Sequence, residues 1–268
     1  MALTILNTAA SSSSALAKQT QSSLEKSYAR LSAGLRINSA ADDAAGLAIA
    51  TRMSADVRGL NQARNNVNDG VSMTQVAQGA LSEVQTGMQR LQELATQSAN
   101  GTLTDTDRAA LQAEAEQIQS QITSTLENTQ YNGKSLLSAD ATVTLQLGQD
   151  EGDALDLATT DLTASLQNID ISTQAGAESA LSTMQTNLAT VSSEQGKLGA
   201  YENRLSAAAS VLSTESVNYE ASLARIQDAD IASESANQLN SQVRQQAALS
   251  VLTQANQLSG QVYQLLQN

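Results

Sequence analysis

Two adjacent carboxylates, Asp42 and Asp43, stand in the alanine-rich stretch "SAADDAAGLAIATRM", residues 39–53. Paired acids of this kind can hold a metal ion or divide the roles of acid and base between them. The chain contains no histidine or cysteine, and no glycine-rich loop follows the pair. An apolar helical pattern does follow it, and Asp before a helix caps free backbone N–H groups and meets the positive end of the dipole. We therefore predict that Asp42 and Asp43 begin a helix, with Ser39 as a rival cap one turn earlier.

Two other stretches could bind ligands. "NTQYNGKS", residues 128–135, ends like a phosphate-binding loop, but that motif needs glycine in place of Asn128 and a preceding strand. "DEGD", residues 150–153, could chelate calcium, but it lacks the alternating spacing of a calcium loop. We interpret the first as a turn after a helix and the second as the exposed tip of a hairpin.

The missing residue types exclude most kinds of catalytic site. Without cysteine the chain has no disulfide, thiolate metal site or thiol nucleophile, and without histidine it has no imidazole base. Carboxylates that act as acid and base need a concave pocket, which thin helices rarely build. We predict that the protein is not an enzyme and takes no cofactor or metal.

The charge of the chain argues against two classes of partner. The net charge is −13, and the 14 basic residues are scattered. Nucleic-acid binders show a basic stripe and membrane-surface helices a basic face, and no apolar run approaches the roughly 18 residues of a bilayer span. We predict no nucleic-acid and no membrane partner. The amino end has no basic region before Lys18, so we also expect no signal peptide.

Two long seams of apolar residues indicate long helices. Proline is absent, so nothing in the 268 residues forces a helix to break. We predict one helix from about Asp43 to Ala99 and another from about residue 177, packed on each other through residues seven apart. The first seam is interrupted only by Thr74, and the core positions are Met53, Leu60, Val67, Leu81, Met88, Met184, Val191, Leu198, Leu205, Leu212 and Ile226.

The middle of the chain changes period. Thr104 and Asp107 form a capping-box-like pair before a further helix that ends near Asn132-Gly133. Residues 141–157 alternate apolar and polar side chains around "GQDEGD", which predicts a β-hairpin. The predicted fold class is mainly α, with long antiparallel helices in coiled-coil-like packing and a small central β-hairpin region.

The two chain ends carry weaker amphipathic patterns. Their apolar residues are diluted by Ser, Gln, Asn and Ala, and a lone helix depends on packing for most of its stability. We predict that both ends are marginal in a monomer and acquire partners on assembly. The assembly residues are Leu6, Leu16, Leu24, Leu31, Leu252, Leu258, Val262, Leu265 and Leu266.

Several long motifs resemble bacterial flagellin. They include "LSAGLRINSAADDAAGLAIATRM" at 31–53, "NDGVSMTQVAQGAL" at 68–81 and "MQRLQELATQSANGT" at 88–102. Near the other end stand "LGAYENRL" at 198–205, "ARIQDADIA" at 224–232 and "QQAALSVLTQANQ" at 245–257. The resemblance covers nearly everything outside residues 138–176, and it is to a short member that lacks the outer variable domains.

The resemblance implies a subunit that assembles with copies of itself into the flagellar filament, outside the cell, for swimming motility. Residues 1–43 and 230–268 would form the discontinuous inner-tube coiled coil, and residues 44–229 the outer tube. Type III export, a flagellin export chaperone, the filament cap and hook–filament junction proteins are further expectations. The alternatives are a hook–filament junction protein, which shares the terminal helices, and a soluble coiled-coil binding module.

The resemblance also implies recognition by the animal Toll-like flagellin receptor. The family's contact surface corresponds here to Gln89, Arg90, Leu94 and Glu114. A second arginine of the family is replaced by Gln92, which lacks a charged, planar donor group. We expect receptor binding to persist in weakened form.

Overall fold

The computed structural model describes residues 2–166 and 169–267, and the side chains of 11–164, 166 and 169–257. The chain divides into two compact units. The terminal unit comprises the residues up to Val57 and those from Asn218 onward, and the central unit comprises Arg58–Val217. Both divisions fall inside helices, α2 (Ala44–Ser98) and α5 (Gln174–Gln227), whereas the sequence placed the domain limits near the helix ends.

The central unit is built on the packing of α2 against α5. Every seam residue from Leu60 to Leu212 is buried, and Thr74, also buried, donates its hydroxyl to the carbonyl of Val71. Gln75 and Gln78 donate to the carboxylate of Glu202, whereas Gln85, further along α2, accepts from Gln195, which comes earlier in α5. Residue numbers thus rise along one helix as they fall along the other, so the two helices are antiparallel.

The outermost seam positions, Met53 and Ile226, are only half-buried and belong to the terminal unit. The apolar seam therefore forms a closed core only within the central unit.

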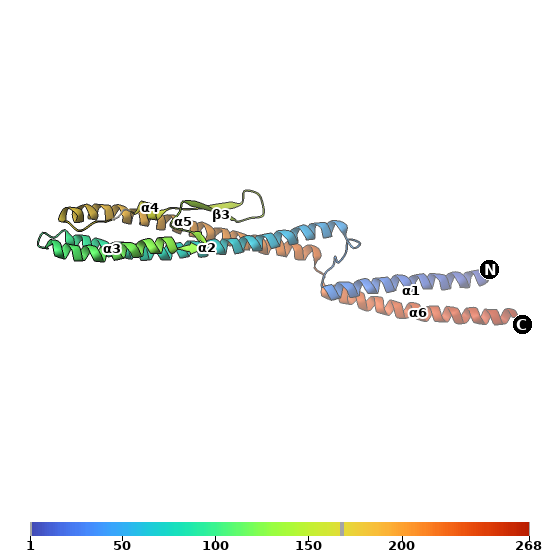
Figure 1. Ribbon diagram of the computed structural model, residues 1–268. Helices are drawn as coiled ribbons and strands as arrows, with labels where there is room; N and C mark the ends of the chain where they lie inside the picture. Colours follow the sequence, from blue (N-terminus) through green and yellow to red (C-terminus); the bar gives the residue numbers. More distant parts are fainter. Residues whose placement is uncertain (1, 167–168, 268) are drawn as a thin grey trace. The chain divides into compact units, whose positions relative to one another are not determined.

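Helix α3 (Asp105–Asn128) lies alongside α2 (Figure 1). Its start has the predicted capping box: Thr104 accepts from the Asp107 backbone N–H, and the Asp107 carboxylate accepts from the Thr104 N–H. The sequence did not reveal Arg108, which is buried and donates to the backbone carbonyls of Ser98, Asn100 and Leu103. This arginine gives the Ser98 carbonyl, at the end of α2, a hydrogen-bond partner that the helix does not supply, and it ties the following loop to the same side chain.

Two antiparallel hairpins follow α3. The pair β3 (Ala141–Gln146) and β4 (Ala154–Thr159) confirms the predicted hairpin and buries Leu155 and Leu157. The pair β1 (Gln130–Tyr131) and β2 (Lys134–Ser135) was expected only as a turn. A four-residue helix, α4 (Leu162–Ser165), was not expected.

Gly70 explains how the β3–β4 hairpin comes so close to α2. A Cβ atom at this position would collide with the Leu145 side chain of β3. In addition, the Asn66 side chain of α2 donates to the carbonyl of Gln146 at 3.0 Å. A glycine inside a helix costs stability, and here the cost is offset by the close packing of the hairpin.

The terminal unit is organised around α1 (Ala2–Ala33) and α6 (Ile231–Gln267), which run antiparallel (Figure 1). Gly34, with φ 71°, ends α1 by donating its N–H to the carbonyl of Arg30. Arg36 then donates its N–H to the carbonyl of Gln227, so the ends of α1 and α5 are joined by backbone bonds. The mainly α fold class with long antiparallel helices and small hairpins is confirmed. No helix in the described part of the chain has both the length and the apolar character that a membrane span requires.

Candidate functional site

Over the described side chains, those of 11–33 and 231–257, the contact between α1 and α6 is largely polar. Leu24 and Ala248 are buried in it, together with Thr20 and Ser27. Polar side chains join the two helices at three levels: Gln21 with Gln245, Tyr28 with Gln242 at 2.9 Å, and Arg30 with Glu234 at 3.8 Å. Within this described part of the pair, few apolar side chains are therefore buried between the two helices.

Large apolar side chains remain uncovered on both helices. Leu16 of α1 is 55% exposed, and on α6 the exposed fractions are 61% for Leu239, 65% for Val243, 52% for Leu249 and 55% for Val251. At 3.6 residues per turn, Leu239 and Val243 lie on one face of α6, and Leu249 lies on another. An amphipathic helix that packs on a single partner is apolar on one face only. Helix α6 is thus built to be covered from more than one side.

The predicted assembly residues differ in burial. Leu24 is buried between α1 and α6, and Leu31 and Leu252 are half-buried. Leu16 is exposed. The remaining positions lie within α1 and α6, but their side chains are outside the described residues: Leu6, Leu258, Val262, Leu265 and Leu266.

Val251 is a further exposed apolar residue of α6 that was not among the predicted assembly residues. It stands seven residues before Leu258 and fourteen before Leu265, so heptad spacing was the signal that could have identified it. Its exposure adds another direction from which α6 can be contacted.

The two acids that could have formed a site are engaged with their own chain. The Asp43 carboxylate accepts from the Gly46 N–H at 2.8 Å, and its carbonyl accepts from the Leu47 N–H at 3.0 Å, so Asp43 is the N-cap of α2. The Asp42 carboxylate instead accepts from the Ser39 hydroxyl and N–H, at 3.0 and 3.1 Å. These bonds, the hydroxyl bond above all, lower the pKa of Asp42 below its ordinary value. Asp42 therefore closes the turn before α2, and only Asp43 caps the helix.

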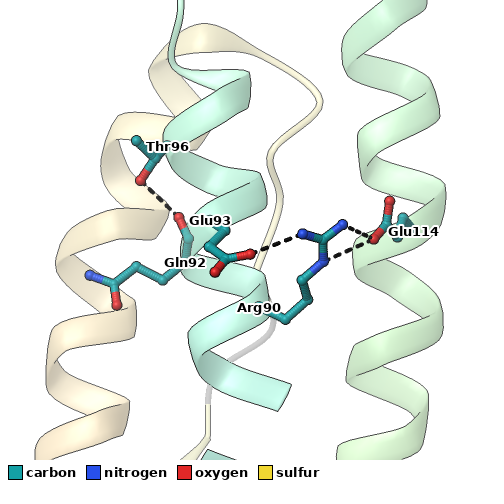
Figure 2. Close-up of polar contacts among 5 residues, drawn as sticks. All are labelled: Arg90, Gln92, Glu93, Thr96 and Glu114. Atoms are coloured by element: carbon teal, nitrogen blue, oxygen red, sulfur yellow. Dashed lines mark hydrogen bonds and ion pairs between the residues drawn. The ribbon is translucent and has the colours of Figure 1, made fainter. Parts of the chain in front are cut away.

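An exposed charged cluster lies where α2 faces α3 (Figure 2). Arg90 donates to Glu114 through Nη2 at 2.7 Å and Nε at 3.1 Å, and to Glu93 through Nη1 at 2.9 Å. The hydrogen bonds with Glu114, then those with Glu93, raise the pKa of Arg90. The guanidinium group is thus held in one orientation on the surface by two carboxylates.

The other predicted receptor contacts differ in accessibility. Gln89 and Glu114 are exposed, as predicted for a surface. Leu94 is 1% exposed, because it packs in the core of the central unit. Its assignment as a direct contact is corrected: Leu94 supports the surface from below. Gln92 is half-buried, and its carbonyl accepts from the Thr96 hydroxyl (Figure 2).

One cavity of the central unit has no acidic or basic side chain in its described lining. It has a volume of about 270 Å³ and lies among α2, α3 and α5. Met88, Gln119, Met184 and Asn187 are among the residues that line it. The described residues also contain no cluster of acids that could hold a metal ion.

Long paired helices with large exposed apolar side chains are the architecture of a protein that associates with other chains. The model of the bacterial flagellin N-terminal helical region matches residues 6–142, and that of the C-terminal helical region matches residues 181–266. The chain therefore belongs to the bacterial flagellin family. It is a structural subunit of the extracellular flagellar filament and not an enzyme.

Individual relatives agree with this assignment. The chain is 43% identical to the flagellin of Halalkalibacterium halodurans over 214 residues, which are 78% of this chain and 79% of that protein. It is 44% identical to the flagellin of Salmonella muenchen over 152 residues, 57% of this chain but only 30% of that protein. The Salmonella flagellin thus extends far beyond the part that it shares with this chain.

Two solved structures share the fold. The crystal structure of Bacillus cereus flagellin has a TM-score of 0.51 at 28% identity and covers 55% of this chain and 88% of that one. A Vibrio parahaemolyticus protein assigned as flagellar hook-associated has a TM-score of 0.60 at 15% identity, with 70% of this chain and 100% of that one covered. The second likeness concerns the fold alone.

Proposed function

We propose that the subunit polymerises mainly through α1 and α6, with residues 1–43 and 230–268 forming the inner tube of the filament and residues 44–229 the outer tube. The observation that carries the proposal is the exposure of large apolar side chains on more than one face of α6. Contiguous exposed apolar surface on a soluble protein is a usual sign of an interaction site. In a helical polymer each subunit has neighbours in several directions, which fits apolar residues on several faces.

The energy available from this surface is large. Full burial of a Val or Leu side chain contributes roughly 1.5–3 kcal/mol. The four residues Leu239, Val243, Leu249 and Val251 are each more than half exposed in the single chain, so neighbouring subunits can still bury most of their area. A subunit in the filament can bury these side chains against several neighbours at once, whereas two isolated monomers can bury only some of them. We therefore expect two monomers to bind each other weakly and a monomer to bind the end of a filament more tightly.

A charge substitution on α6 tests the proposal. Val243 is 65% exposed, so Val243→Glu is expected to change the melting temperature of the monomer little. In the filament the new carboxylate would be buried without a partner, which carries a large desolvation penalty. We expect Val243→Glu to abolish growth of filaments from added seeds, as observed by electron microscopy.

The control is Asn237→Asp, which introduces a carboxylate at an exposed polar position of α6 on the side away from Leu239 and Val243. It is expected to polymerise. Normal growth of Val243→Glu filaments would show that this face of α6 is not buried by neighbours. Growth of long tubes by the wild-type protein also separates a filament subunit from a hook–filament junction protein.

The same surface is the proposed binding site for the assembly partners. Apolar residues that the filament buries must be shielded before polymerisation, which favours an export chaperone that binds α6. We propose the filament cap and the hook–filament junction proteins as further partners of the terminal unit. A chaperone bound to α6 is expected to inhibit seeded growth in proportion to its occupancy.

We also propose that the Arg90 cluster is recognised by the animal Toll-like flagellin receptor. The specific observation is the fixed, exposed guanidinium of Arg90, held by Glu93 and Glu114 beside the exposed Gln89. A donor group that is already oriented loses less entropy on binding. Gln92 supplies no second guanidinium, so affinity is expected to be reduced relative to family members that have one.

Arg90→Ala is expected to weaken receptor binding at least several-fold without unfolding the central unit, because the side chain is exposed. Arg64→Ala, at another exposed position of α2, is the control and should bind normally. Affinity can be measured with immobilised receptor ectodomain and monomeric protein. Equal affinities of Arg90→Ala and the wild type would reject this surface as the contact.

A further inference from the structure

The chain contains two Asn-Gly pairs, Asn100-Gly101 after α2 and Asn132-Gly133 between β1 and β2. Asparagine before glycine is prone to spontaneous deamidation, because glycine has no side chain to obstruct attack by its own backbone nitrogen. The two pairs have identical local chemistry and different surroundings. We infer that Asn132 is a deamidation site of the folded subunit and that Asn100 is protected by the loop that contains it.

The reaction requires only water. The deprotonated backbone nitrogen of Gly133 attacks Cγ of Asn132, a C–N bond forms, and the Cγ–NH₂ bond breaks with loss of ammonia. Water then opens the resulting succinimide at one of its two carbonyls. The products are aspartate or isoaspartate, and in isoaspartate the main chain passes through the side-chain carbon.

The turn at Asn132 leaves the reacting groups accessible. Asn132 and Gly133 are both exposed, and nothing lies within 4 Å of the position of a Cβ on Gly133. Their φ angles of 49° and 76° form a two-residue turn between the paired residues Tyr131 and Lys134. Within the described part of the chain the Asn132 carboxamide makes no hydrogen bond that would hold it away from the nitrogen.

Attack requires a change in the backbone angles of Asn132, so the turn must open locally. The β1–β2 ladder consists of only two residue pairs. Exposed segments with few contacts open at low free-energy cost. The hairpin therefore permits the rearrangement without unfolding of the helices.

The turn at Asn100 is held in several ways. The Asn100 carboxamide oxygen accepts from the Thr102 N–H at 3.1 Å, and the Asn100 carbonyl accepts from Arg108 Nη1 at 3.2 Å. Arg108 is buried and also binds the carbonyls of Ser98 and Leu103, on either side of the pair. Attack by Gly101 would break these contacts, so the loop opposes it.

Deamidation at Asn132 would have a structural consequence. Aspartate tolerates a positive φ, so that product should keep the turn and add a negative charge beside Lys134. Isoaspartate lengthens the main chain by one carbon and cannot preserve a two-residue turn. The hairpin directly precedes the buried Leu136 and Leu137, so isoaspartate is expected to loosen their packing.

Trypsin places the two pairs on separate peptides, residues 91–108 and 109–134. Wild-type protein is incubated folded or in denaturant and then digested, and mass spectrometry follows the mass gain from exchange of NH₂ for OH. In the folded protein, peptide 109–134 should deamidate at least several-fold faster than peptide 91–108 and yield an aspartate–isoaspartate doublet. In denaturant the two rates should become similar.

Equal rates in the folded protein, or a faster reaction in peptide 91–108, would overturn the inference. Asn132→Gln localises the reaction, because peptide 109–134 also contains Asn128. The doublet should disappear in this variant, and its persistence would assign the reaction to Asn128. Arg108→Ala removes the tryptic site between the two pairs, so this variant is digested with a glutamate-specific protease, which places Asn100 on peptide 94–114 and Asn132 on peptide 128–151. Under conditions where circular dichroism shows the folded state, deamidation of Asn100 should accelerate several-fold in the variant while that of Asn132 is unchanged. An unchanged rate at Asn100 would contradict its protection by Arg108.

Discussion

At the residue scale, neighbouring side chains of the same type have different tasks. Asp43 caps α2 through the Gly46 N–H, whereas Asp42 binds Ser39 and closes the preceding turn. Both sets of bonds join residues three apart in sequence. Such short-range relations are visible in the sequence, which is why capping at Asp43 and at Thr104 could be predicted. Arg108 could not be predicted, because its acceptors come together only once α2 ends and α3 turns back.

Four acids share a mechanism that makes stability depend on pH. Each carboxylate accepts from a Ser or Thr hydroxyl, which is the largest cause of the lowered pKa, and also from backbone N–H groups. The ordinary value is 3.8, and the groups with lowered pKa are Asp42, Asp107, Asp161 and Asp170. A carboxyl group with a lower pKa in the folded state stabilises that state when ionised. This stabilisation is present above the unfolded pKa and is lost as the pH falls through the folded value.

Thr104→Ala tests this linkage at the start of α3. Removal of the hydroxyl takes away the largest cause of the lowered pKa of Asp107. The variant should therefore melt lower than the wild type, and the difference should be larger at about pH 6 than at about pH 3. Thr106→Ala, at an exposed position in the same turn, is the control. A difference in melting temperature that is independent of pH would contradict the role of the capping box in lowering this pKa.

At the element scale, the seam between α2 and α5 organises the central unit. The heptad spacing shows which residues face inward, because their period is set by the helix. The heptad spacing does not show where the β3–β4 hairpin packs on α2. At that place Gly70 lies against the Leu145 side chain of β3. The spacing also does not show that Gln112 and Ser98 bind the backbone N–H and carbonyl of Ile171. These contacts join residues far apart in the sequence, so no local pattern reports them.

Leu205→Asp tests the seam. Leu205 is fully buried, so the substitution places an unpaired carboxylate between α2 and α5. The expected cost is about 3–5 kcal/mol, as for other uncompensated buried charges. Circular dichroism of the monomer should show a melting temperature lower by roughly 10 °C. Val211→Asp, at a position that is 57% exposed on the same helix, is the control and should melt like the wild type. Equal melting of the two variants would mean that the seam does not carry the stability of this unit.

At the scale of the whole molecule, the two compact units differ in how they use apolar residues. The central unit buries its seam and the inner residues of its hairpins. The described part of the α1–α6 pair buries Leu24 and Ala248 and leaves larger apolar side chains exposed. The dilute patterns of the ends predicted weak monomer packing from the sequence alone. The several exposed faces of α6 required the structure, because spacing does not reveal which side of a helix its partner covers.

We propose that the two chain ends mediate polymerisation, whereas the central unit provides most of the stability of the folded monomer. Seeded polymerisation of a variant that lacks residues 252–268 tests this division of roles most directly, with the melting of the monomer recorded in parallel. The truncation leaves the central unit intact, so the main melting transition should stay nearly unchanged. It removes several apolar anchors, each worth roughly 1.5–3 kcal/mol when neighbours bury it, so no filaments should grow from wild-type seeds. Long tubes of the truncated protein in the electron microscope would contradict the assignment of α6 as an assembly surface.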